Sequence, residues 1–597
     1  MEAAPPRTRG RRLRRGTVER PLNARLVRVG FVVVAPALLA LVFSVSTTGA
    51  LPRSLEPLFD AESATTFAET LSVQFPSRVP GSDGARDAAL WYRETVAALR
   101  LPTEEDVWTE DLAGVGRVEL RNVITVVAGR SDESIVIVAH RDNAGVTEPA
   151  AENASGTAAL IEIGRGFAPQ ELGPDPLPEH TLVLVSTDGG AYGGAGAARF
   201  VDTSPLARSA IAVVILDGLD GGTPRLAIAG DDPVSPARAL VRTAAARMSE
   251  ETRVPTELPS VLDQLVALGV PYALQEQGRF LAGGLSAVTI GTRGSPERGG
   301  GASAARLGQL GRAAEALVGS LDRSVGGAYR TPDTLFFADR AVSGWTVRLV
   351  LVLTVVPFAL GLVDLVVRGR RRGLPFAPAV RAQRSRLGLW ALAGLLVWLG
   401  ALVGVFPTGA SLPLAPYTSL TGGRPAFALL VIGAVLLLTW LVVVREPLAP
   451  RTPPAADERL AGLVVALVLV GIVAVTLAFV RPYALLFVLP SLYAWIWLPL
   501  EGRAATRIVL YLLGLVGPIV GLLVLARDLG LSVFDGAVYV VGLATVGYLA
   551  PLTVVAMLAW GAAAAQVGAL AFGRYAPYAG GSEPPPGVVG RVLRRAR

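Results

Sequence analysis

Long apolar runs near both ends of the chain constrain its fold more than any other feature. The first covers residues 30–50, and after about 290 residues of ordinary polarity the others follow at 344–367, 387–406, 425–444, 460–480, 483–500, 508–526 and 537–563. A helix of about 20 residues crosses the hydrocarbon core of a bilayer. We therefore predict eight membrane spans, plus or minus one, because the last run is long enough to break in two. With 52% hydrophobic and 17% charged residues, a purely soluble chain is excluded.

Arginines beside these runs predict how the chain is oriented. They crowd the segment before residue 30, the loop at 368–386 and the last residues of the chain. Because arginine-rich short loops stay in the cytoplasm, we predict a multi-pass integral membrane protein with both termini cytoplasmic. The predicted division is a cytoplasmic tail (1–28), a signal anchor (29–50), an extracytoplasmic domain (51–340), a bundle of about seven helices (341–573) and a second cytoplasmic tail (574–597).

The charge balance of the extracytoplasmic segment limits its partners. Residues 51–340 hold 25 Arg against 38 Asp and Glu, a net charge of −13, although the whole chain is at +7. A basic, nucleic-acid-binding surface on this domain is therefore not expected. The absence of cysteine excludes disulfides, thiolate metal sites and a cysteine nucleophile.

Short β-branched runs alternate with Ala-rich amphipathic runs between residues 51 and 340, which predicts an α/β fold with a mostly parallel, helix-covered sheet. The expected strands are 122–127, 135–139, 181–186, 211–216 and 287–290. The expected helices are 85–99, 153–166, 191–201, 236–248 and 302–321. Ligand sites of such sheets form at the carboxyl ends of the strands, so the residues that follow each strand are the candidates.

Those residues are polar. His140 and Asp142 follow the second strand, Asp188 the third and Asp217 the fourth, and Glu152 opens a helix. A carboxylate two residues from a histidine can hold its second ring nitrogen, as metal-ligating histidines usually require. His140, Glu152 and Asp217 suit zinc in type and number.

In this order and spacing the segment resembles metallopeptidase family 28, the co-catalytic di-zinc aminopeptidases whose fold glutaminyl cyclases share. Besides the elements above, the resemblance rests on 78–82 (Arg-Val-Pro-Gly-Ser), 152–156 (Glu-Asn-Ala-Ser-Gly), 278–281, 287–290 and the Thr-Pro-Asp at 331–333. It implies that His140, Glu152 and Asp217 are ligands of one metal and that Asp142 orients His140. The arrangement of anchor, domain and bundle is also similar to multispanning endoplasmic reticulum metallopeptidases and to the attachment subunit of the GPI transamidase.

The same resemblance implies losses. The family's adjacent pair of glutamates, general base and metal ligand, falls on Gly190 and Ala191, and its closing histidine falls on Arg330. A two-zinc centre is therefore not expected, and at most one zinc is. Asp188 is a weak candidate for the base after a shift of register. Arg330 either replaces the second metal by pairing with Glu152 or points to solvent.

We therefore interpret the chain as a membrane-anchored pseudoenzyme that binds a peptide, a lipid-linked substrate or a partner protein in the degenerate cleft. General-base catalysis is worth roughly 10²–10⁴-fold, so its loss impairs hydrolysis. One alternative is an active one-zinc membrane aminopeptidase or cyclase. A second is a transporter with an accessory external domain, against which the scarcity of ionisable residues within the runs weighs.

Overall fold

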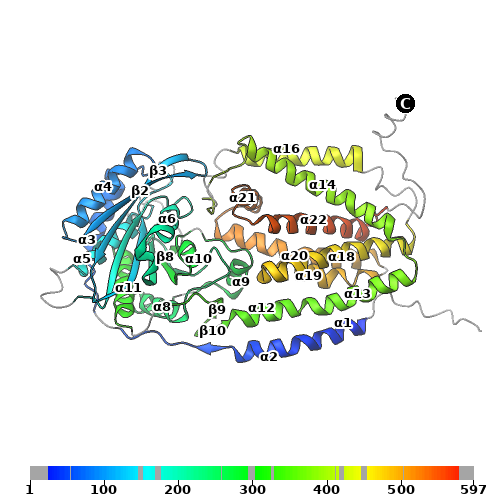
Figure 1. Ribbon diagram of the computed structural model, residues 1–597, viewed down its shortest axis with the longest axis horizontal. Coiled ribbons are helices and arrows are strands. Elements are labelled where there is room, and N and C mark those ends of the chain that lie inside the picture. Colours follow the sequence, from blue (N-terminus) through cyan, green and yellow to red (C-terminus); the bar gives the residue numbers. More distant parts are fainter. Residues whose placement is uncertain are drawn as a thin grey trace, which may run out of the picture.

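A computed structural model describes residues 24–53, 56–145, 152–168, 177–256, 258–273, 275–293, 303–324, 329–409, 412–415, 423–444, 454–501 and 503–576. A mixed sheet with its helices forms one side of the molecule, and a bundle of long apolar helices forms the other (Figure 1). A small antiparallel sheet lies where the two parts join; its strands are β1 (Ser46–Thr47), β9 (Thr334–Phe337) and β10 (Arg340–Ser343).

The large sheet has seven strands in the order β2-β3-β5-β4-β6-β8-β7. Its four neighbouring strands β5, β4, β6 and β8 run parallel, while β2, β3 and β7 are antiparallel to their neighbours. The strands are β2 (Thr103–Leu112), β3 (Gly116–Val127), β4 (Ser131–His140), β5 (His180–Thr187), β6 (Ala210–Asp217), β7 (Thr223–Ala227) and β8 (Ala287–Arg293).

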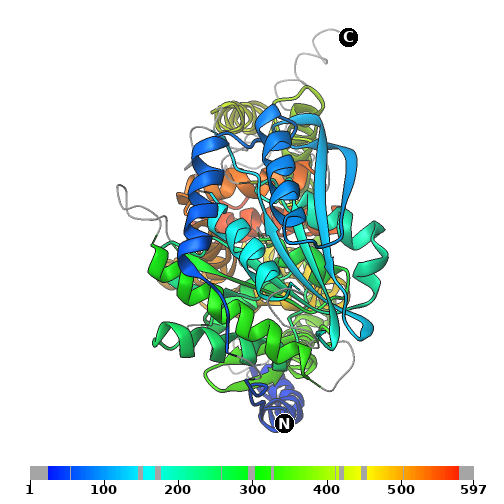
Figure 2. The ribbon, with the colours of Figure 1, turned by 90° about the vertical axis from the view of Figure 1, so that its left-hand side faces the viewer.

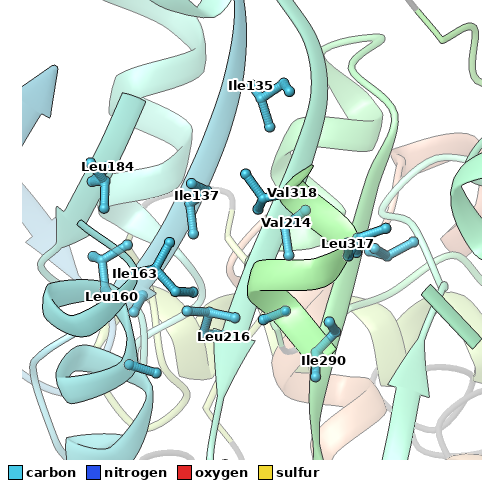
Figure 3. Close-up of a cluster of buried hydrophobic side chains, with 14 of the residues drawn as sticks. Ile135, Ile137, Leu160, Ile163, Leu184, Val214, Leu216, Ile290, Leu317 and Val318 are labelled. Carbon is cyan, nitrogen blue, oxygen red and sulfur yellow. The ribbon is translucent and has the colours of Figure 1, made fainter. Parts of the chain in front are cut away.

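Helices cover both faces of this sheet (Figure 2), because its central strands are apolar on both sides. One face is covered by α3 (Ala61–Gln74), α4 (Asp83–Ala97), α5 (Ala154–Gly166), α8 (Arg238–Thr252) and α11 (Ala304–Asp322). Figure 3 shows Leu160 and Ile163 of α5 and Leu317 of α11 packed against the strands. The other face is covered by α6 (Ala195–Thr203), α7 (Pro205–Arg208) and α10 (Gln277–Ala282). The predicted helix-covered α/β fold is confirmed.

Each predicted strand and helix of the domain has a counterpart, displaced at its ends by a few residues. Strands β2 and β7 and helices α3, α7, α9 (Val261–Gly269) and α10 were not expected from the sequence. Strand β2 was missed because it is rich in Asp and Glu and lies at an edge of the sheet, where one side faces solvent. The register of β2 on β3 gives the sheet an antiparallel edge that apolar periodicity alone does not reveal.

Seven helical segments of the described chain are long and apolar enough to cross a membrane. They are 25–43 (α1, Ala24–Gly30; η1, Phe31–Val34; α2, Ala35–Phe43), 344–371 (α12, Gly344–Leu353; α13, Val355–Arg371), α14 (Phe376–Leu402), 424–442 (α16, Arg424–Thr439; η2, Trp440–Val444), α18 (Ala456–Val480), α20 (Ala504–Asp528) and α22 (Pro551–Ala571). The predicted run at 483–500 forms only a shorter helix, η3 with α19 (Pro482–Ala484, Leu485–Trp495), followed by η4 (Leu498–Leu500). The run at 537–563 is divided between α21 (Val533–Thr545) and α22.

Specific polar contacts join the sheet domain to the bundle. Tyr548, between α21 and α22, donates its hydroxyl to the Asp231 carboxylate at 2.7 Å and to the Pro271 carbonyl at 3.1 Å. Asp333 accepts from Tyr483 at 3.0 Å and pairs with Arg348 at 2.7 Å. These contacts place the domain against the ends of the helices that begin or finish on its side (Figure 1).

Candidate functional site

The candidate site lies where the central parallel strands end. His140 at the end of β4 is in register with Thr187 at the end of β5, and β6 ends beside them at Asp217. Side chains of paired residues on neighbouring strands lie on the same face of a sheet. His140, Thr187 and Asp217 therefore lie together at the carboxyl ends of neighbouring parallel strands. The sequence predicted this position for the histidine and the aspartate.

His140 is the centre of a group of acidic side chains. Its Nε2 atom lies 3.6 Å from Oδ1 of Asp217, and its Nδ1 atom lies 3.4 Å from Oδ1 of Asp142. Burial by itself lowers the pKa of the imidazole, but the contacts with Asp142 and Asp217 outweigh it and raise the pKa well above 6.5. The two flanking carboxylates thus favour the protonated form of this imidazole.

Asp142 fixes the turn that follows β5. Its two carboxylate oxygens accept the backbone N–H groups of Gly190 at 2.8 Å and Ala191 at 3.1 Å. The turn is packed directly on the histidine, because a Cβ atom added to Gly190 would lie 2.2 Å from Cβ of His140. The resemblance assigns glutamates to positions 190 and 191, but there the chain provides two backbone N–H donors to Asp142. Position 190 leaves no room for a side chain.

Glu152 reaches the same group from the start of α5. Its Oε2 atom accepts the backbone N–H of Ala144 at 2.8 Å, and burial raises its pKa while His140 opposes the rise. The neighbouring Asn153 adopts a left-handed conformation, φ 42°, and its amide donates to the carbonyls of His140 and Leu216. These bonds tie the entry of α5 to the ends of β4 and β6, which positions Glu152.

Asp188 faces away from His140. Successive strand side chains alternate between faces, so Asp188 lies with Arg141 on the side opposite His140 and Thr187. Its carboxylate accepts the backbone N–H groups of Arg121 at 3.1 Å and Gly189 at 2.9 Å and lies 3.6 Å from the Arg141 guanidinium. Burial raises its pKa to about 6, against the effect of Arg141. The geometry gives no support to the base role considered for it.

Arg330 lies at the opposite edge of the sheet. The backbone N–H of its neighbour Tyr329 donates to the carbonyl of Ile211, at the beginning of β6, whereas Asp217 ends that strand. Six residues of strand span about 20 Å. Arg330 is exposed, and in the described part of the chain it forms no ion pair with Glu152. The interpretation that Arg330 replaces a second metal is therefore corrected: α11 carries the chain back across the sheet before the Thr-Pro-Asp segment begins.

Glu276 belongs to the site, although it was not among the site residues expected from the sequence. It precedes α10, is 1% exposed, and accepts the Thr187 hydroxyl at 2.5 Å on the face that carries His140. Its second oxygen, Oε2, is buried without a hydrogen-bond partner in the described residues. Burial raises its pKa to about 7, while His140 and the Thr187 hydroxyl oppose the rise. Glu276 precedes a short helix and follows no strand, so a search limited to the residues after each strand does not find it.

The elevated pKa of Glu276 predicts a pH dependence of stability. The folded state holds this proton more tightly than the unfolded chain, so stability falls as pH rises from about 4.5 to about 7. Each pKa unit corresponds to about 1.4 kcal/mol, so the loss amounts to at most about 3 kcal/mol. Glu276→Gln is expected to flatten that part of the profile, measured by denaturant unfolding of the full chain in detergent between pH 5 and 8. Identical slopes in the two proteins would contradict the assignment.

The resemblance implies ligands for at most one metal ion, namely His140, Glu152 and Asp217. The described residues contain no group of three or more His, Asp or Glu side chains arranged to hold a metal ion. His140 and Asp217 face each other as two donors for one ion, but Glu152 is bonded to Ala144 and neither position 190 nor 191 supplies a donor side chain. Zinc remains plausible at this site, where His140 and Asp217 are the facing donors.

Comparison with known proteins agrees with the sequence motifs. The profile of peptidase family M28 matches residues 122–264, whereas comparison with curated proteins found no match. One similar solved structure is a glutaminyl cyclase from Fimbriiglobus ruber, with 15% sequence identity and a TM-score of 0.34 over 45% of this chain and 98% of that chain. A leucine aminopeptidase precursor from Bacteroides thetaiotaomicron has 16% identity and a TM-score of 0.36 over 44% of this chain and 98% of that chain. A zinc aminopeptidase from Bacillus subtilis has 11% identity and a TM-score of 0.36 over 44% of this chain and 95% of that chain. Within the sheet domain, residues 122–264 are thus similar to peptidase family M28.

Proposed function

We propose that the domain binds its ligand at the His140 edge without efficient hydrolysis, so that the chain acts as a membrane-anchored pseudo-peptidase. The observation that carries this proposal is the turn at Gly190 and Ala191. Both backbone N–H groups are bonded to Asp142, and a side chain at position 190 would overlap His140. A general base cannot stand where the M28 resemblance requires one, and Asp188 faces the other side of the sheet.

The charges of the site support a cationic group as the feature it recognises. Asp142, Glu152, Asp217 and Glu276 lie around a single imidazole. Asp142 and Glu276 are buried and the other two are half-buried, and carboxylates gathered in this way favour a positive partner. An ammonium group has three donors and no acceptor, which suits carboxylates that approach from several directions. The amino end of a peptide, of a partner protein or of a lipid-linked ligand has this chemistry.

The position of the bundle supports a ligand that is itself attached to a membrane. Residues 412–415, which lie in sequence between α14 and α16, contact the turn beside the site. A Cβ atom added to Gly193 would meet the Pro413 carbonyl at 2.4 Å, and Leu412 packs with Tyr192. Burial, and after it the charges of Asp142 and Glu152, raise the pKa of Tyr192 to about 12, so this tyrosine lies near the site acids. A ligand entering here would pass between the domain and the helices.

We also propose that the sheet domain is extracytoplasmic and that both chain ends are cytoplasmic. The arginine-rich ends of α1 and α13 and the start of α14 lie at the end of the bundle away from the sheet domain (Figure 1). Short basic segments favour the cytoplasmic side.

The test measures binding and turnover with one probe pair on the purified full-length protein. An aminoacyl arylamide with a free amine is expected to bind without release of arylamine, and its N-acetylated counterpart is expected to bind at least about tenfold more weakly, because one charge-assisted contact is lost. Asp217→Asn should weaken binding of the free amine. Asp188→Asn, at the same edge but on the other face, is the matched control. Equal binding of both probes, or of neither, would overturn the proposal.

A one-zinc hydrolase or cyclase is the second candidate, favoured by the 3.6 Å approach of His140 Nε2 to Asp217. It predicts about one zinc per chain by elemental mass spectrometry, lost in His140→Ala, together with release of arylamine that the same substitution abolishes. Release of arylamine that His140→Ala abolishes would show that the domain is a hydrolase and would overturn the proposed binding function.

A further inference from the structure

Arg386 is buried inside the helical bundle, although its sequence neighbourhood predicted a cytoplasmic loop. It lies ten residues into α14, is 8% exposed, and is surrounded by α18 and α22. Its close neighbours on the same helix, Arg381 and Arg384, are exposed. A charge held between apolar helices is costly unless an opposite charge or strong hydrogen bonds compensate it.

Within the described residues, the contacts of Arg386 are all with neutral groups. Its Nη1 atom donates to the Ala382 carbonyl at 3.1 Å and to Oε1 of Gln566 at 3.2 Å, and its guanidinium lies 5.9 Å from the centre of the Tyr575 ring. The Gln566 amide in turn donates to the Gly462 carbonyl at 2.7 Å. Over the residues that the structure describes, no Asp or Glu pairs with this guanidinium, so its positive charge lacks an anion.

Two neighbours of Arg386 carry unused polar atoms. Both amide atoms of Gln383, one helical turn away on the same face of α14, are buried without a hydrogen-bond partner in the described chain, as is the Tyr575 hydroxyl. The Tyr575 ring packs closely on Gly462, where a Cβ atom would lie 2.3 Å from it. The Arg386 guanidinium thus lies over the Tyr575 ring, and the Gln383 amide is one helical turn away from it on α14.

We propose that this cluster, Arg386 with Gln383 and Tyr575, binds a phosphate group at the end of the bundle remote from the sheet domain. A phosphate oxygen accepts from a guanidinium, an amide and a hydroxyl alike, and arginine is suited to phosphate by its planar set of donors. A lipid headgroup at the membrane surface carries this group, and so does the free ion. The site is independent of the M28-type domain and of its proposed function.

The test uses the full-length protein stripped of lipid in detergent and two probes, phosphatidylglycerol and inorganic phosphate. Binding is measured by native mass spectrometry for the lipid and by calorimetry for the ion. Arg386→Gln is expected to weaken binding by about tenfold or more, because a charge-assisted hydrogen bond is lost. Arg384→Gln, on the exposed side of the same helix, is expected to leave it unchanged.

Tyr575→Phe removes only the unused hydroxyl and keeps the packing of the ring, so it tests the site even if Arg386→Gln fails to fold. It should weaken binding of the same probe several-fold, as loss of one hydrogen bond of about 1 kcal/mol implies. Lipid binding that depends on Arg386 and Tyr575 supports a headgroup site, and phosphate binding with the same dependence and no lipid binding supports a site for the free ion. Equal binding of both probes by wild type, Arg386→Gln and Tyr575→Phe would overturn the proposal.

Discussion

Arg78→Met is expected to destabilise the sheet domain by about 3–5 kcal/mol, because it leaves several buried carbonyl groups without a hydrogen-bond donor. Arg78 has no exposed surface, and burial lowers its pKa to about 10 against the effects of Asp142 and Glu152. Its guanidinium donates to the carbonyls of Arg141 at 2.6 Å, Phe75 at 2.7 Å and Glu152 at 2.8 Å. One side chain therefore joins the segment after β4 to the start of α5.

The measurement is denaturant unfolding of the full chain in detergent, with hydrogen exchange at residues 141–145 as a local readout. Arg86→Met is the matched control, because Arg86 is an exposed residue of α4 whose ion pair with Asp83 is on the surface and contributes about 0–1 kcal/mol. A loss of stability no larger than that of the control would mean that Arg78 does not organise the site.

Gly190→Glu is expected to destabilise the domain by about 1–3 kcal/mol and to produce no peptidase activity. The added Cβ would lie 2.2 Å from Cβ and 2.5 Å from Cγ of His140, so either the imidazole or the turn must move. Movement of the turn would break the bonds that Gly190 and Ala191 donate to Asp142. Restoring a carboxylate here thus disrupts the site rather than repairing it.

Ala191→Glu is the control for this prediction, because that position already carries a Cβ and is partly exposed. Its cost is expected to be smaller than that of Gly190→Glu, and unfolding and arylamine release are measured on both. A stable Gly190→Glu protein that releases arylamine would show that the catalytic register of the M28 family is intact, contrary to the proposed binding function.

Part of the site follows from local rules alone. His140 and Asp217 end parallel strands, and the carboxyl ends of such strands meet at one edge, so their proximity was predictable without knowing the packing. Arg330, in contrast, was placed at the site only by the resemblance, and the structure does not bring it there. Its Thr-Pro-Asp neighbours match a family motif, but α11 intervenes and returns the chain to the other edge, and motif order carries no information on which edge a segment reaches.

The burial of Glu276 and Arg386 could not be predicted from the sequence, for a different reason. Neither follows a strand or interrupts an apolar run, and only packing brings Glu276 to Thr187 and Arg386 to Gln566. Their burial depends on residues about 90 and 180 positions away, a separation at which no periodicity operates.

By itself the sequence determined the membrane helices and the helix-covered sheet, because backbone hydrogen bonding and apolar burial act through local patterns of period 3.6 and 2. It also determined that His140 and Asp217 lie together. The tertiary structure alone decided which face Asp188 takes, that position 190 has no space for a side chain, and that Glu276 and Arg386 are buried. These outcomes depend on contacts between distant segments, whose geometry is set only when the sheet, its helices and the bundle have packed.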